Sequence, residues 1–130
     1  MNSPRIEFDV IVIGAGMAGS AAAAVAARHG LKTAIIERGQ SPGAKNYFGG
    51  ALYTHALEEI YPDLWDRKPP LQRPVTETGF WFLSEDGAVK ATVQGGHLNN
   101  KPMDAYVALR AEFDSWWAAQ AESEGAFIIP

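Results

Sequence analysis

FDVIVIGAGMAGSAAAAVAARHGLKTAIIE, residues 8–37, is the stretch that decides the fold. It opens with an apolar run typical of a buried strand, passes through a glycine-rich turn into an alanine-rich segment, and closes with a second apolar run. Alanine has the highest helix propensity, and a helix is the usual connection between two parallel strands. The stretch therefore predicts a βαβ unit, with its helix over about 17–29 and a C-terminal cap at His29-Gly30.

The turn has the pattern Gly-x-Gly-x-x-Gly, and each glycine has a physical reason. Gly14 permits the tight turn, Gly16 lets a pyrophosphate approach the backbone, and Gly19 lets the helix lie close to the strands. Glu37 follows roughly 20 residues later, where its carboxylate can accept hydrogen bonds from a ribose. An ordinary glycine-rich turn does not require this acid. We therefore expect a dinucleotide site that includes Gly14, Ala15, Gly16, Met17, Ala18, Gly19 and Glu37.

Composition bounds the remaining possibilities. The chain has 130 residues, a net charge of −4 and no cysteine. The negative charge argues against a nucleic-acid partner. Without cysteine the chain cannot form disulfides, thiolate zinc sites or iron–sulfur ligation. No metal-ligand spacing is present, so we predict no metal site. No secretory signal or membrane-spanning run is visible, so we expect a cytoplasmic location.

The segment after Glu37, residues 38–50, is a loop by composition. It follows the second strand on the side where nucleotide folds bind ligands, so its polar and glycine residues are candidate ligands. The alternative is that the cations are solvated and the paired glycines form a plain turn. The candidates are Arg38, Lys45, Asn46, Gly49 and Gly50.

The remaining chain alternates between helical and extended patterns. We predict a helix over 54–61, an extended connector over 66–76, and an antiparallel hairpin of strands 79–84 and 88–93, with a polar face on its second strand. A loop at 95–104 contains His97, which we expect to be solvated. A strand at 105–109 leads to a helix at 111–124 that buries Phe113, Trp116 and Trp117. Residues 125–130 resemble a new strand, so we expect a truncated, N-terminal part of a longer protein.

In this order, the segments resemble the FixC family, which is similar to electron-transfer flavoprotein–quinone oxidoreductases. The resemblance extends from Phe8 through nearly the whole chain. The glycine fingerprint is generic, whereas three later segments are more specific: PGAKNYFGGALYTHALEEIYPDLW, PLQRPVTETGFWFLSEDGAV and YVALRAEFDSWWAAQAESEGA.

The resemblance implies an α/β fold: a Rossmann-like FAD-binding domain with a βαβ core at 8–37, an inserted hairpin at about 79–94 and a helix at 111–124. The substrate or quinone domain would be absent from residues 1–130. It also implies that Arg110, which opens the last helix, contacts FAD. Met17 departs from the family pattern, which usually has proline in the first helical turn, where proline is pre-organised.

The family also implies an activity. It suggests an FAD-dependent oxidoreductase that passes electrons from an electron-transfer flavoprotein towards quinone or a ferredoxin-like partner, in association with nitrogen fixation. The full-length protein could lie peripherally at the inner membrane. The flavin carries the chemistry, so no catalytic residue is named. The alternatives are a geranylgeranyl reductase or monooxygenase of the same fold, an inactive truncated fragment, and NAD in place of FAD.

Overall fold

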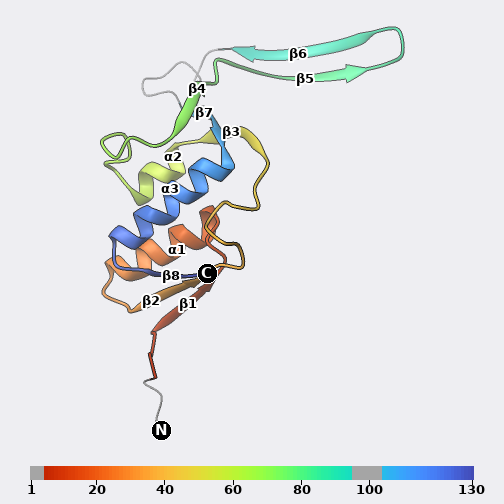
Figure 1. The fold of residues 1–130 in the computed structure, drawn as a ribbon. Coiled ribbons are helices and arrows are strands. Elements are labelled where there is room, and N and C mark those ends of the chain that lie inside the picture. Colours follow the sequence, from red (N-terminus) through yellow and green to blue (C-terminus); the bar gives the residue numbers. More distant parts are fainter. Residues whose placement is uncertain (1–4, 95–103) are drawn as a thin grey trace.

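The computed structural model describes residues 5–94 and 104–130. Its lower layer is a parallel sheet of order β1-β2-β8, formed by β1 (Val10–Ile13), β2 (Thr33–Ile36) and β8 (Phe127–Ile129). Helix α1 (Met17–Arg28) connects β1 to β2 (Figure 1). The predicted βαβ unit is confirmed, and the apolar run near the C-terminus forms the third parallel strand.

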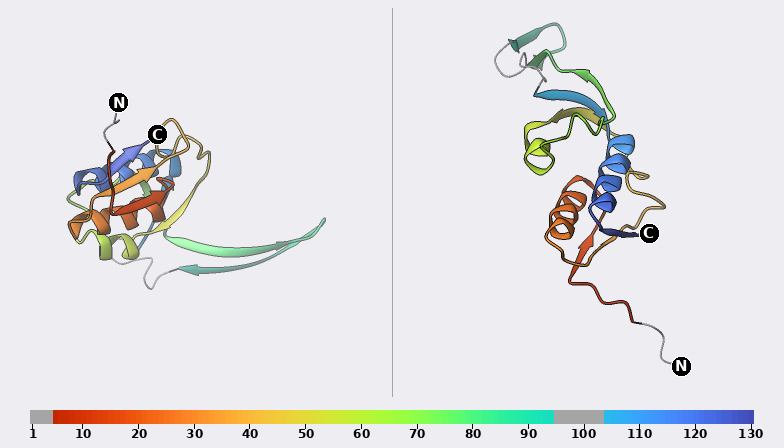
Figure 2. Two further views of the ribbon diagram at one scale, coloured as in Figure 1. Left: turned by 90° about the horizontal axis from the view of Figure 1, so that it is seen from below. Right: turned by 90° about the vertical axis from the view of Figure 1, so that its left-hand side faces the viewer.

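Helix α3 (Arg110–Ser123) lies beside α1 on one face of this sheet (Figure 2). Alanines let the two helices pack closely, and the large side chains of α3 fill the core. Phe113 and Trp117 are almost fully buried, whereas Trp116 is partly buried. The indole N–H of Trp117 donates a hydrogen bond of 3.0 Å to the carbonyl of Met17, at the start of α1. The predicted aromatic core is thereby confirmed.

A second sheet lies above the helices, with the antiparallel order β3-β7-β4. It is formed by β3 (Gly49–Tyr53), β7 (Ala105–Leu109) and β4 (Leu71–Pro74), with the short helix α2 (His55–Ile60) after β3. Two sequence predictions are corrected here. Gly49 and Gly50 pair with Leu109 and Ala108 instead of lying in a loop, and the connector at 66–76 contains an edge strand. Proline is tolerated at such an edge, which explains how β4 can end at Pro74.

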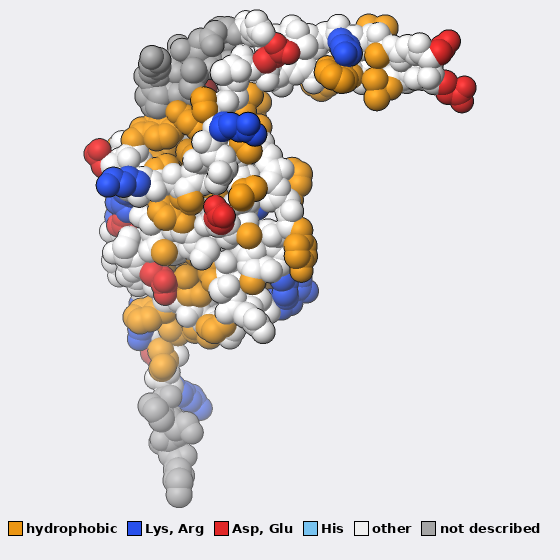
Figure 3. All heavy atoms as spheres, turned by 45° about the horizontal axis from the view of Figure 1, so that its top comes forward, with side chains coloured by type: hydrophobic (Ala, Val, Ile, Leu, Met, Phe, Trp, Pro, Cys, Tyr) orange, Lys and Arg blue, Asp and Glu red, His pale blue; other side chains and the backbone are white. Residues whose placement is uncertain are grey.

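The predicted hairpin is present as β5 (Glu77–Leu83) and β6 (Ala88–Gln94), and it extends away from the body (Figures 1 and 2). All residues of both strands are exposed, including Phe80 at 73% and Trp81 at 60%. Figure 3 shows hydrophobic side chains along this arm. Polar and apolar residues alternate along β6, but its apolar face is exposed like its polar face. The predicted loop with His97 lies outside the described residues.

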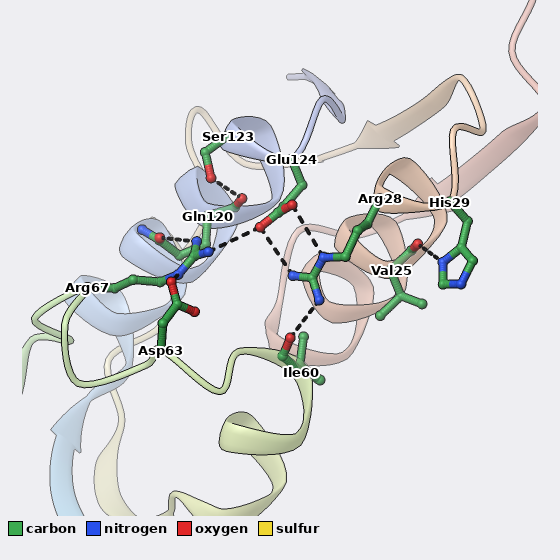
Figure 4. A network of polar contacts seen from close by, with 9 residues as sticks. All are labelled: Val25, Arg28, His29, Ile60, Asp63, Arg67, Gln120, Ser123 and Glu124. Atoms are coloured by element: carbon green, nitrogen blue, oxygen red, sulfur yellow. Dashed lines mark hydrogen bonds and ion pairs between the residues drawn. The ribbon is translucent and has the colours of Figure 1, made fainter.

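A network of arginines joins α1, α3 and the segment after α2 (Figure 4). The Glu124 carboxylate accepts hydrogen bonds from Arg28 at 3.1 Å and from Arg67 at 3.3 Å. Both guanidinium groups also lie over the Tyr61 ring, at 4.9 Å for Arg28 and 4.2 Å for Arg67. Arg28 additionally donates to the carbonyl of Ile60 at 2.8 Å. One carboxylate thus connects three segments that are distant in sequence.

We expect Glu124→Gln to destabilise the chain at neutral pH but not in acid. The hydrogen bond from Arg28 is the main cause that lowers the pKa of Glu124, and the charge of Arg67 adds to it. A carboxyl whose pKa is lower in the folded state stabilises above its unfolded pKa, and this stabilisation is lost as the pH falls through the folded pKa. The loss at pH 7 should be about 1 kcal/mol at most, because Arg28 is partly exposed and water screens the pair.

Urea denaturation across a pH series measures this effect. Glu122→Gln is the matched control, because Glu122 is an exposed carboxylate at the end of the same helix. It should leave the free energy of unfolding unchanged at every pH. A Glu124→Gln deficit that persists undiminished in acid would show that the ion pairs are not its cause.

Candidate functional site

A cleft of about 740 Å³ opens where β1 and β2 end. Ligands of open parallel α/β sheets bind at the carboxyl ends of the strands, and pockets of about 300–1,000 Å³ are typical of cofactor sites. The lining comes from the glycine turn, the end of β2, the loop before β3 and the first turns of α3. The lining residues are Ile13, Gly14, Gly16, Ile36, Glu37, Arg38, Gly43, Lys45, Asn46, Arg110 and Asp114.

The glycine turn presents backbone to this cleft. Gly14 has a φ of +96°, and its N–H donates a hydrogen bond of 2.7 Å to the carbonyl of Ile36. Gly16 is the N-cap of α1, and the space beside its Cα is open. The free N–H groups of the first helical turn and the helix dipole therefore meet open space suited to a phosphate. Of the predicted turn residues, Gly14 and Gly16 line the cleft, whereas Ala15, Met17, Ala18 and Gly19 do not.

Glu37 follows directly after β2 and its side chain contacts the glycine turn. Its carboxylate accepts a hydrogen bond of 2.8 Å from the N–H of Ala15 and one of 2.6 Å from the N–H of Gly39. These two bonds lower the pKa of Glu37, and the charges of Lys45 and Arg38 lower it further. The group is therefore ionised at neutral pH. Each carboxylate oxygen has a second lone pair, so hydrogen bonds from a ribose remain possible.

Three cationic side chains, those of Arg38, Lys45 and Arg110, line the same cleft. The ammonium of Lys45 donates a hydrogen bond of 3.3 Å to the carbonyl of Arg38. Positive side chains beside a helix N-terminus suit an anionic pyrophosphate, so the donor set fits a dinucleotide. Gly49 and Gly50, which are paired in β3, are not among the lining residues. Their proposed contact with the flavin stays a prediction.

Asp114 was missed from the sequence. Its side chain has no exposed surface, and its two oxygens accept hydrogen bonds of 2.9 Å from Nε and Nη2 of Arg110. The amide of Asn46 donates to the same carboxylate. The Asp114 carboxylate raises the pKa of Arg110, which holds the guanidinium charged. The spacing of four residues between Arg110 and Asp114 was a signal, because such pairs meet on one side of a helix.

Gly43 and two isoleucines, Ile13 and Ile36, also line the cleft without having been predicted. Within residues 5–94 and 104–130, no group of three or more His, Cys, Asp or Glu is placed to hold a metal ion. None of the helices in this described part is long and apolar enough to cross a bilayer.

The family of FAD dependent oxidoreductases provides a sequence model that matches residues 9–127. The chain belongs to this family. Its cofactor is FAD, which confirms the sequence prediction of FAD over NAD. The glycine turn, the Glu37 carboxylate and the cationic side of the cleft are the parts of this chain that suit such a ligand.

The curated relatives confirm the resemblance to FixC. The chain is similar to Protein FixC of Salmonella typhi and of Escherichia coli strain K12, each 43% identical over 122 residues. Protein FixC of Azorhizobium caulinodans is 38% identical over 123 residues. These matches cover 94–95% of the chain, whereas the chain spans 28% of the length of each relative.

Solved structures confirm the fold class. A geranylgeranyl bacteriochlorophyll reductase-like protein from Thermoplasma acidophilum has a TM-score of 0.72 and 31% identity, over 93% of this chain and 29% of its own. The myxobacterial chondrochloren halogenase CndH has a TM-score of 0.68 and 24% identity, over 93% of this chain and 28% of its own. The halogenase, at this identity, supports the fold alone.

Proposed function

We propose that this chain is the FAD-binding portion of a FixC-like oxidoreductase. It would pass electrons from an electron-transfer flavoprotein towards quinone or a ferredoxin-like partner, in association with nitrogen fixation. The observation that carries the proposal is the cleft in which the glycine turn, the Glu37 carboxylate and three cations face one space. The similarity to FixC proteins supports the choice among flavoproteins.

Each part of the cleft has a proposed role. The N-terminal turn of α1 binds the pyrophosphate, and Glu37 accepts hydrogen bonds from the adenosine ribose. Arg38, Lys45 and Arg110 balance the charge of the phosphates. FAD bound there supplies the electron-carrying ring system, which is why no catalytic side chain is assigned. We also propose a cytoplasmic location, with peripheral association of a longer protein at the inner membrane.

A second candidate is a geranylgeranyl reductase, favoured by the 31% identity to the reductase-like protein from Thermoplasma acidophilum. The FixC proteins are more similar, at up to 43% identity, and therefore support the first candidate better. The two functions share the cofactor site and differ in the electron acceptor. Flavin binding thus tests the site, and electron transfer to a quinone or to a prenyl double bond distinguishes the candidates.

We expect the purified chain to bind one FAD and little NAD. Titration of the chain into FAD should quench flavin fluorescence and shift the visible flavin absorbance, whereas a parallel titration of NADH should leave its fluorescence unchanged. In a second step, the FAD-loaded protein is mixed with reduced electron-transfer flavoprotein and a soluble quinone. A chain that folds but leaves flavin fluorescence unaltered would identify it as an inactive fragment.

A further inference from the structure

Asp114 is a buried carboxylate in the second turn of α3. A buried charge is costly unless partners compensate it, and here three N–H groups do so. Two come from Nε and Nη2 of Arg110, each at 2.9 Å, and the third comes from the amide of Asn46. The carboxylate charge is thus compensated by donors that belong to two residues of the cleft.

These donors come from two different segments. Arg110 is the first residue of α3, whereas Asn46 lies in the loop between β2 and β3. The backbones of the two segments also contact closely. The N–H of Arg110 donates a hydrogen bond of 3.0 Å to the carbonyl of Phe48, and a Cβ at Gly43 would lie 2.5 Å from the carbonyl oxygen of Ala111. Asp114 therefore connects the polar ends of two segments that are already packed together.

The geometry of the pair leaves several donors free, because a guanidinium has five N–H groups and Asp114 accepts from two of them. Arg110 uses Nε and Nη2 on Asp114, and within the described residues its Nη1 has no hydrogen-bond partner. The side chain of Arg110 is 32% exposed, whereas that of Asp114 has no exposure. The buried carboxylate thus fixes the orientation of the guanidinium, and the remaining N–H donors are available to an anion in the cleft.

We propose that Asp114 is a positioning residue for the cofactor, holding the Arg110 guanidinium and the Asn46 amide at the cleft before FAD binds. This inference rests on the proposed FAD site. Orienting two side chains in advance lowers the entropy cost of ordering them on binding, which would otherwise weaken the affinity for the ligand. Asp114 does not contact the cofactor in this arrangement but acts through its two neighbours.

The direction in which Asp114→Asn changes the Kd for FAD distinguishes a positioning role from a purely electrostatic effect. A carboxylate near an anionic pyrophosphate repels it, so if charge alone mattered Asp114→Asn would tighten FAD binding. If Asp114 positions its neighbours, the same change weakens binding. The amide nitrogen that replaces one carboxylate oxygen is itself a donor, so it cannot accept a hydrogen bond from Arg110 or Asn46. We expect the Kd for FAD to rise about tenfold, as for the loss of one charge-assisted hydrogen bond.

Flavin fluorescence titration of the full chain measures the Kd, with far-UV circular dichroism to verify folding. Asp63→Asn is the matched control, because it removes another carboxylate that pairs with an arginine four residues away, outside the cleft. Its Kd should be unchanged. Combining Asp114→Asn with Arg110→Gln should cost less than the sum of the separate effects, because a guanidinium that has lost its orientation contributes less.

Arg110→Lys provides a second variant should Asp114→Asn not fold. Lysine keeps the charge but cannot form the bidentate contact with Asp114, so a positioning role predicts weaker FAD binding by this variant too. Equal or tighter FAD binding by a folded Asp114→Asn, or unchanged FAD binding by Arg110→Lys, would overturn this inference but leave the proposed function standing. Failure of the unsubstituted chain to bind FAD would overturn the proposed function, and the inference with it.

Discussion

The Gly16→Val variant is expected to fold and to lose FAD. Gly16 has a φ of −77° and a ψ of −178°, an extended conformation that any residue adopts. A Cβ at this position would meet no atom within 4 Å, so the added side chain begins in open space, and the folded state loses mainly the preference for glycine over valine at an N-cap. Its side chain would instead occupy the cleft, where the pyrophosphate must approach the backbone. We expect binding at least about 100-fold weaker, which corresponds to about 2.7 kcal/mol.

Flavin fluorescence titration measures the loss, and thermal unfolding verifies that the variant is still folded. Ala22→Val is the matched control, because it places the same valine side chain at an exposed position of α1. It should leave the Kd unchanged. If Gly16→Val retained its normal flavin content, the pyrophosphate would have to lie elsewhere.

Gly19→Ala should have the opposite profile, with a large loss of stability as its primary effect. A Cβ at Gly19 would lie 2.0 Å from the carbonyl oxygen of Gly14 and 3.2 Å from Cγ1 of Val12. Backbone at such a distance cannot move aside without displacing α1 from β1. Overpacking of this kind costs about 1–3 kcal/mol and occasionally more, so we expect a loss near the upper end of this range.

Urea denaturation measures the free energy of unfolding, and Gly16→Ala is the control within the same turn. Both variants exchange glycine for alanine at the start of α1, which matches their effect on the unfolded chain. The alanine at position 19 should lower the denaturation midpoint much further than the alanine at position 16, which loses only the preference for glycine over alanine at an N-cap. Equal midpoints for the two variants would contradict the close approach of helix and turn. Together, the two variants distinguish Gly16, which leaves space for the ligand, from Gly19, which leaves space for the packing of α1 against the turn.

Much of the fold could be predicted because it depends on local patterns. The apolar runs around 10–13 and 34–36, the alanine-rich helix between them and the hairpin at 79–93 all have periodicities visible in short windows. The glycine turn and Glu37 could be assigned to a dinucleotide because their spacing reflects one supersecondary unit. The structure confirms this unit, and the family match confirms FAD as its cofactor.

The second sheet could not be predicted in the same way. Gly49 and Gly50 resemble a turn by composition, yet they lie in β3 because Leu109 and Ala108 supply backbone partners from a distant segment. The proline-rich β4 likewise becomes a strand only by pairing with β7. Propensity is a weak guide where pairing with a partner far along the chain decides the conformation.

For the cofactor site, the sequence alone was enough to predict the glycine turn as the phosphate site, the acid after β2 and the candidate cations. Only the tertiary structure decided how they are held. The Glu37 carboxylate is held by the N–H of Ala15, and Asp114 connects Arg110 with Asn46. The spacing within a βαβ unit is a local property of the chain. Arg110 and Asp114 lie within one helical turn, whereas Asn46 is 68 residues from Asp114 and reaches it only through folding.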